Sequence, residues 1–193
     1  MKVLMTGFEP FGGASLNPSW EAVRRLPDVI GGAEITRLRL PVIYGTAGRM
    51  AAEAVRALGA EMVIATGVAS GRTRLTPELA ALNWRMASLP DGAGVRCDGG
   101  MIEPDAPAAL MTRLPVLPLT RALNDAGIPA ALSTSAGSYV CNDVYWHLLR
   151  QEEALGCRAL FVHVPDTPQM DTQTAARGLM TCVQFLTAAP SDS

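Results

Sequence analysis

The sequence predicts a single-domain α/β/α sandwich, in which helices cover both faces of a mostly parallel central sheet and an antiparallel hairpin forms an excursion. Five short apolar segments alternate with helical segments along the chain, which is the order of a parallel sheet with crossover helices. These segments are apolar almost throughout, as in strands buried on both faces. The chain has 193 residues, 49% of them hydrophobic, which suffices for one core and is short for two. We therefore expect one domain over residues 1–193.

The first half of the chain predicts three strands and two helices. Pro18 stands at a first-turn position before apolar residues spaced three apart, and Gly59 suits the left-handed end of an Ala-rich helix. β-Branched residues between Gly-Gly and a proline favour a strand in the second apolar segment. The expected elements are strands at 2–8, 34–42 and 61–69 and helices at 18–26 and 46–59.

The second half begins with a stretch, residues 75–100, in which regular alternation fails and turn residues are frequent. It predicts an antiparallel hairpin or a long excursion. Regular elements then return, and the last residues, 189–193, have a disordered composition. The expected elements are helices at 118–127, 141–156 and 171–189 and strands at 129–137 and 157–165.

Composition excludes several classes of function. The formal net charge is -2, with acids and bases interspersed, which argues against a nucleic-acid surface or a polybasic membrane patch. The first apolar run stops at Thr6 and no segment approaches a membrane span, so we expect a soluble, cytoplasmic protein. Four cysteines without a CxxC pair and two histidines predict neither a disulfide framework nor a metal site.

Loops that follow parallel strands meet at one edge of the sheet, and ligand sites lie there. Cys141 opens a predicted helix at that edge, where backbone amides would favour a thiolate and could hold an oxyanion. A buried, inert cysteine is the alternative. His163 ends the last predicted strand and could act as the base for this thiol, although a histidine of the core is the alternative there.

The other histidine, His147, lies six residues after Cys141 on the same predicted helix and would face away from it. A nucleophile and base pair needs a third group that orients the imidazole. Composition does not choose among the acidic candidates, which are Glu9, Glu78, Asp143 and Asp166.

The glycine-rich segment TGFEPFGG follows the first strand but has neither a P-loop pattern nor GxGxxG. A nucleotide or phosphate site is therefore weakly supported. Phe8 and Phe11 in this segment could wall a small flat ligand. Alternatively, they plug the end of the sheet.

Four blocks then carry a resemblance: TGFEPFGG followed by NPSWEAV, GVASGR with TPELAALN, AGIPAALSTSAGSYVCN, and FVHVP. Their order over roughly residues 1 to 185 resembles that of the pyrrolidone carboxyl peptidases (pyroglutamyl peptidase I), which are cysteine peptidases. The resemblance implies removal of an N-terminal pyroglutamyl residue from peptides, without a cofactor. It implies Cys141 as nucleophile, His163 as base and Glu78 as the acidic third member, with substrate contacts from Phe8, Phe11 and Val140.

One segment departs from the family. Similar proteins carry an arginine, thought to assist near the oxyanion, where NWRMASLPD has Ser88. Arg85 lies three residues earlier, so on an extended strand it would point to the opposite face. A catalytically impaired homologue that binds pyroglutamyl or lactam ligands is therefore the alternative function. Similar proteins form dimers or tetramers, and Met101 and Leu110 would suit such an interface, although core packing explains both equally well.

Overall fold

The computed structural model describes residues 1–188 and has a six-stranded central sheet in the order β2-β3-β1-β4-β10-β5. The four inner strands are parallel, whereas β2 and β5 join the two edges in antiparallel pairing. The mostly parallel sheet expected from the sequence is thereby confirmed. The strands are β1 (Lys2–Phe8), β2 (Val29–Ile30), β3 (Ala33–Leu40), β4 (Met62–Val68), β5 (Thr76–Pro77) and β10 (Arg158–Val164).

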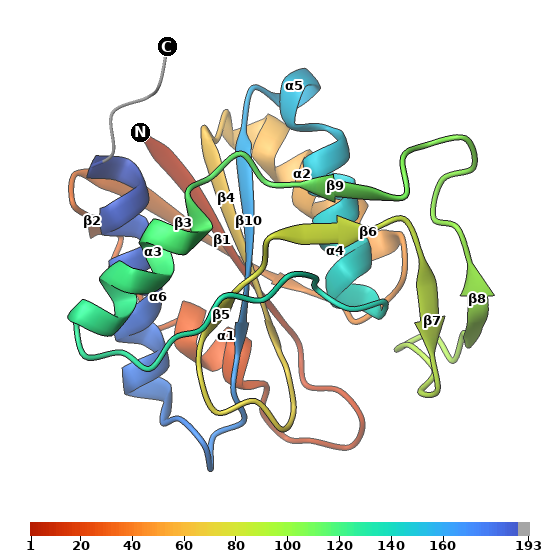
Figure 1. Cartoon of the computed structure of the whole chain (residues 1–193), viewed down its shortest axis with the longest axis horizontal. Coiled ribbons are helices and arrows are strands. Elements are labelled where there is room, and N and C mark those ends of the chain that lie inside the picture. The colour runs from red at the N-terminus through yellow and green to blue at the C-terminus, as the bar shows by residue number, and fades with distance from the viewer. Residues whose placement is uncertain (189–193) are drawn as a thin grey trace.

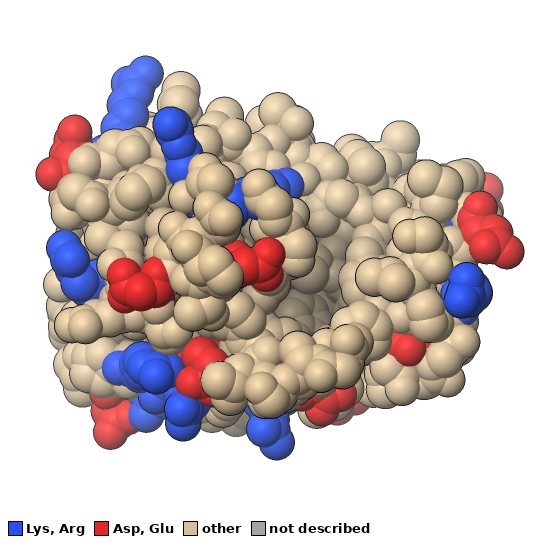
Figure 2. Space-filling model, turned by 90° about the horizontal axis from the view of Figure 1, so that it is seen from below, with Lys and Arg blue, Asp and Glu red and all other residues tan. Residues whose placement is uncertain are grey.

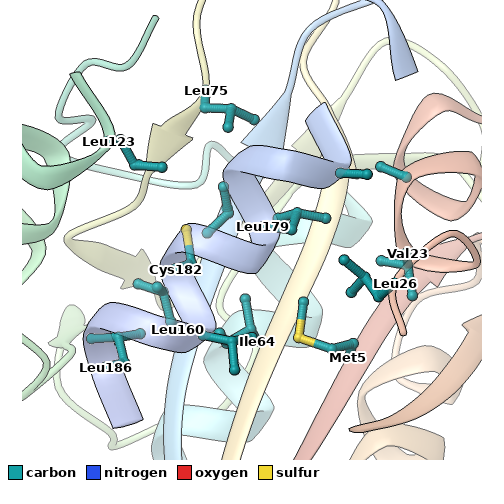
Figure 3. Packing of buried hydrophobic residues seen from close by; sticks show 14 of the residues in the cluster. Met5, Val23, Leu26, Ile64, Leu75, Leu123, Leu160, Leu179, Cys182 and Leu186 are labelled. Atoms are coloured by element: carbon teal, nitrogen blue, oxygen red, sulfur yellow. The ribbon is translucent and has the colours of Figure 1, made fainter. Parts of the chain in front are cut away.

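Helices cover both faces of this sheet (Figure 1). One face carries α1 (Pro18–Val23), α3 (Val116–Asp125) and α6 (Thr172–Ala188), and the other carries α2 (Thr46–Leu58), α4 (Val140–Arg150) and α5 (Glu152–Leu155). Each layer buries its own apolar cluster against the sheet. In the first cluster, Ile64 and Leu160 from the strands lie under Leu179 of α6 (Figure 3). The predicted sandwich of three layers is therefore present.

Burial explains the apolar strands. Every residue of β1 after Lys2 is buried, and β4 and β10 are buried along nearly their whole length. Close approach of the layers also dictates a glycine: a Cβ at Gly7 would lie 2.8 Å from backbone atoms of Trp20 in α1. The helix can therefore rest on the end of β1 only because this position has no side chain.

The strand expected at 129–137 is wrong. This segment makes only two isolated bridges, Leu75 to Ala130 and Glu78 to Ser133, and does not enter the central sheet. Its two serines, one threonine and exposed Leu132 provide too few apolar side chains to lie between two helical layers. The short strand β5 pairs with β10 instead and forms that edge of the sheet.

The irregular region after residue 75 contains the expected antiparallel excursion. Strand β6 (Ala80–Leu82) pairs with β9 (Ala109–Met111), and β7 (Arg85–Ala87) pairs with β8 (Cys97–Gly100). The second pair projects from the body of the molecule, at the right of Figure 1. We call residues 84–101 the arm.

Helix boundaries differ slightly from the sequence expectations. Helix α1 ends at Val23, and the helix expected at 141–156 is divided at Gln151 into α4 and α5. The last residue of the helix expected at 171–189 and the composition-based tail at 189–193 lie outside the described residues. Within residues 1–188, no helix combines the length and apolar character needed to span a membrane.

Candidate active site

The parallel strands β1, β4 and β10 end at one edge, at the bottom of Figure 1, and a pocket of about 300 Å³ lies there. Seen from below, the surface is hollowed between the body and the arm, and uncharged residues form most of the rim (Figure 2). Phe8, Phe11 and Cys141 all line this pocket, so the structure brings three of the predicted residues together. The other lining residues are Ala14, Leu16, Asn17, Pro18, Val42, Val68, Ser70, Leu89, Tyr139 and Asp166.

Cys141 is the second residue of α4 and is partly exposed. Its sulfur lies directly over β4, because a Cβ added at Gly67 would be 2.6 Å from Sγ. Only glycine leaves room for the thiol at that point of the strand. Helix α4 starts after Tyr139 without a side-chain cap, so its first-turn amides point toward the sheet edge without a side-chain acceptor.

His163 is next to Gly67 on the neighbouring strand, since the two residues are opposite each other in the parallel register of β10 and β4. The imidazole and the Cys141 sulfur therefore share one small region of the sheet. Nδ1 of His163 lies 2.7 Å from Oε1 of Glu78, whose side chain is completely buried. This contact leaves Nε2 as the ring nitrogen available for proton transfer.

Burial dominates the protonation of this pair. It lowers the pKa of His163, against the opposing effect of the hydrogen bond to Glu78. Burial raises the pKa of Cys141 to about 12, and the negative charge of Glu78 acts in the same direction. The amide of Cys141 lowers that pKa, as its helix position predicts, but is outweighed. The resting pair is therefore a neutral thiol beside a neutral imidazole.

Of the acidic candidates, Glu78 is the one whose carboxylate contacts Nδ1 of His163. Asp166 lines the pocket and lies 3.4 Å from the Ser70 hydroxyl. Asp143 accepts a hydrogen bond from the Gly45 amide at 2.6 Å, on the side of α4 that faces α2. The substrate contact expected from the Val140 side chain is not seen: this side chain is buried in the core and does not line the pocket.

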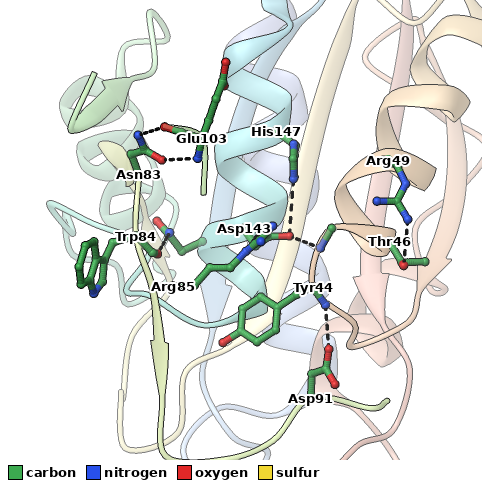
Figure 4. Close-up of polar contacts among 12 residues, drawn as sticks. Tyr44, Thr46, Arg49, Asn83, Trp84, Arg85, Asp91, Glu103, Asp143 and His147 are labelled. Atoms are coloured by element: carbon green, nitrogen blue, oxygen red, sulfur yellow. Dashed lines mark hydrogen bonds and ion pairs between the residues drawn. The ribbon is translucent and has the colours of Figure 1, made fainter. Parts of the chain in front are cut away.

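His147 lies in a separate polar cluster between α2 and α4 (Figure 4). Its Nε2 is 3.8 Å from Asp143, and a Cβ at Gly48 of α2 would be 2.5 Å from its ring. It therefore faces away from Cys141, as the helical spacing predicts. Arg85 is bound to the same Asp143 and lies over the ring of Tyr44, so it does not take the place in the pocket of the arginine that the resemblance led us to expect at position 88.

Sequence reasoning missed three side chains at this edge. Arg72 donates to Glu78 Oε1 at 2.6 Å, Tyr139 lines the pocket immediately before α4, and Leu89 reaches it from the arm. Arg72 stands in the GVASGR block on a strand-end loop, a position that could have suggested it. No pattern indicated Leu89. Over residues 1–188, no three His, Cys, Asp or Glu side chains gather as they would around a metal ion.

Comparisons with known proteins identify the family of this chain. The model of the family described as "Pyroglutamyl peptidase" matches residues 1–189. The pyrrolidone-carboxylate peptidase of Levilactobacillus brevis is 37% identical over the full length of both chains, and that of Pseudomonas fluorescens is 42% identical over 97% of this chain and 90% of its own.

Solved structures of the same family have a closely similar fold. Pyroglutamyl peptidase I of Bacillus amyloliquefaciens has a TM-score of 0.93 and 33% identity, with 97% of each chain covered. The pyrrolidone carboxyl peptidase of Thermococcus litoralis has a TM-score of 0.90 and 35% identity, covering 96% of this chain and 93% of its own. The chain therefore belongs to the pyroglutamyl peptidase family.

Proposed function

We propose that this protein is a cysteine peptidase that removes an N-terminal pyroglutamyl residue from peptides, with Cys141 as nucleophile, His163 as general base and Glu78 as the acid that orients the imidazole. One observation carries the proposal. The Cys141 sulfur rests on Gly67, next to a histidine that is hydrogen bonded to a buried carboxylate, at the wall of a small pocket. Membership of the family supports the same reaction.

The pocket suits the chemistry of a pyroglutamyl group. This group is small, flat and uncharged and lacks a free amine, so apolar walls and a few backbone hydrogen bonds are enough to bind it. Phe8, Phe11 and Tyr139 provide aromatic surface around a volume of about 300 Å³. We assign Phe8 and Phe11 to the two faces of the lactam ring. Val140 would contribute through its main chain, because its side chain is buried in the core.

The reaction would begin with transfer of the Cys141 proton to Nε2 of His163. The thiolate attacks the pyroglutamyl carbonyl carbon, and the first-turn amides of α4 stabilise the oxyanion. Glu78 stabilises the imidazolium through Nδ1. His163 then protonates the leaving amine, and the C–N bond breaks. It next takes a proton from water, which attacks the thioester and releases pyroglutamate and the thiol.

The alternative, a catalytically impaired homologue, has two observations in its favour. Ser88 is exposed on the arm, and Arg85 is bound to Asp143 rather than directed at the pocket. Loss of one oxyanion donor reduces kcat by about 10² to 10³. We therefore expect slow turnover compared with relatives that have the arginine.

The function is tested with a chromogenic pyroglutamyl amide. Wild type should release the chromophore, and Cys141→Ala should abolish turnover while leaving Tm and circular dichroism unchanged. The matched control is Cys97→Ala, which removes a half-buried thiol of the arm and should remain active. Binding of pyroglutamate by wild type without any turnover would establish the impaired homologue instead, and turnover by Cys141→Ala would contradict the mechanism.

Assembly and location extend the proposal. The arm exposes large apolar side chains, namely Trp84, Met86, Leu89, Val95 and Met101, a concentration that favours an interface. Leu110, in contrast, packs on the core. We propose a dimer or tetramer formed through the arm. Light scattering of Met86→Asp, with Leu117→Asp on α3 as control, should show dissociation in the first variant alone.

The four free thiols favour the reducing cytoplasm as the location of this protein.

A further inference from the structure

The loop between β4 and β5 places a cation against the proposed catalytic groups. Nη1 of Arg72 donates to Oε1 of Glu78 at 2.6 Å, the same oxygen that lies 2.7 Å from Nδ1 of His163. The arginine side chain is one-third exposed, whereas Glu78 is completely buried. The guanidinium thus closes the solvent side of the cluster. No step of the proposed reaction involves Arg72.

The buried carboxylate needs this charge. Among the described residues 1–188, the buried Oε2 of Glu78 has no hydrogen-bond partner, so the side-chain hydrogen bonds of this carboxylate are made through Oε1. His163 is neutral at rest because burial lowers its pKa. Arg72 is therefore the permanent positive charge that compensates Glu78, and a buried carboxylate without such a partner is strongly destabilised.

The same guanidinium also fixes the short strand β5, which ends immediately before Glu78. Nη1 of Arg72 donates to the hydroxyl of Thr76, which lies opposite His163 in the antiparallel pairing of β5 with β10. The backbone amide of Arg72 is held by Ala69 in a turn that Gly71 closes with a φ of +84°. A rigid, planar group therefore joins two residues beside His163.

We propose that Arg72 is a positioning residue of the peptidase: it holds Oε1 of Glu78 against Nδ1 of His163, so that Nε2 faces the Cys141 thiol. This inference rests on the proposed function and adds to it. Arg72 does not contact the reacting atoms, and it acts through Glu78.

A positioning role has an electrostatic signature that a purely structural role lacks. The charged and titratable groups that face His163 are Glu78, Arg72 and Cys141. The positive charge of Arg72 lowers the pKa of His163 and also that of Cys141. Its removal should therefore raise the pKa of the base and move the acidic limb of kcat/KM to higher pH.

The test compares Arg72→Gln, Arg72→Lys and Arg74→Gln, an exposed arginine of the same loop, on the chromogenic pyroglutamyl amide. Arg72→Gln should lower kcat at least tenfold with KM within twofold of wild type, and its acidic limb should move to higher pH. Arg72→Lys keeps the charge but not the planar fork, so its kcat should fall threefold to tenfold with a smaller shift of that limb. Arg74→Gln should match wild type.

A kcat of Arg72→Gln within twofold of wild type, with an unmoved acidic limb, would overturn the inference while leaving the proposed function intact. Absence of turnover in wild type would instead reject the proposed function. If Arg72→Gln does not fold, as judged by Tm, Arg72→Lys decides: a kcat within twofold of wild type overturns the positioning role. A loss of kcat in a folded Lys variant supports it.

Discussion

Two polar clusters of similar composition lie in this molecule, and they differ in whether a thiol and a pocket lie beside them. Each joins a completely buried carboxylate to one arginine and one histidine. The first comprises Glu78, Arg72 and His163, and the second comprises Asp143, Arg85 and His147. The first lies at the carboxyl ends of β4 and β10, beside a thiol and a pocket. The second lies between α2 and α4.

The second cluster joins elements of the fold. Asp143 receives the Gly45 amide, just before α2, and binds Arg85 of the arm, so one carboxylate connects three parts of the chain. Nε2 of His147 is buried 3.8 Å from this carboxylate, too far for a hydrogen bond, and no other group within residues 1–188 forms one with it. The comparison teaches that residue types alone do not define a catalytic group. A nucleophile and an open pocket have to be within reach.

The largest effect should come from neutralising each carboxylate. Glu78→Gln should lower kcat by about 10⁴, the effect of removing the orienting charge from a Ser-His-Asp triad. Asp143→Asn should leave kcat per folded molecule nearly unchanged but reduce the free energy of unfolding by about 3–5 kcal/mol, because Arg85 loses its buried partner. Turnover per titrated thiol and urea unfolding measure the two quantities. A tenfold loss of kcat in Asp143→Asn would break the distinction.

Two glycines provide the next test, because each lies against one cluster. In Gly67→Ala, the new Cβ would be 2.6 Å from the Cys141 sulfur, and displacing a nucleophile by about 1 Å reduces activity by about 10². In Gly48→Ala, the new Cβ would be 2.5 Å from the His147 ring, and such overpacking destabilises by about 1–3 kcal/mol. Activity assays and urea unfolding should separate the variants. Equal losses of kcat in both would contradict separate roles.

The sequence predicted the parts of the fold that repeat a simple pattern. Strands β1, β4 and β10 are continuously apolar because helices cover both of their faces, and that pattern is visible in the residues. The segment 129–137 was wrongly predicted because its short apolar start resembles a strand. Its position depends on β5, whose two residues pair with β10 across a long separation in the chain. Local pattern contains no information on that pairing.

The candidate site shows the same limit. The sequence predicts Cys141 and His163 as neighbours by placing each at a strand end of the parallel sheet. His163 does lie near the end of β10, whereas Cys141 follows the segment 129–137, which does not enter the sheet. Glu78 could not be separated from the other acids by residue chemistry, and only the resemblance selected it. Arg72 resembles a solvated loop residue until the tertiary contact with Glu78 is seen. The position of Val140 also depended on the packing of α4, which turns its side chain into the core.

The smallest effect concerns pH and involves both histidines of the chain. Burial lowers the pKa of His163 and of His147. Below the unfolded value near 6.5, the unfolded chain therefore binds protons more readily, and stability falls as pH decreases toward the folded pKa values. Scans of Tm between pH 7.5 and 5.0 should show a shallower decline in His147→Gln than in wild type.

The same variant sharpens the comparison, because its activity should be independent of its stability. His147 does not face Cys141, so His147→Gln should keep the acidic limb of kcat/KM where wild type has it. A shift of that limb would mean that the cluster at Asp143 influences the thiol through α4, whose first turn contains both Cys141 and Asp143. An unshifted limb with a flatter Tm profile would assign part of the acid sensitivity of folding to His147 and would separate it from the acid sensitivity of catalysis, which we attribute to His163.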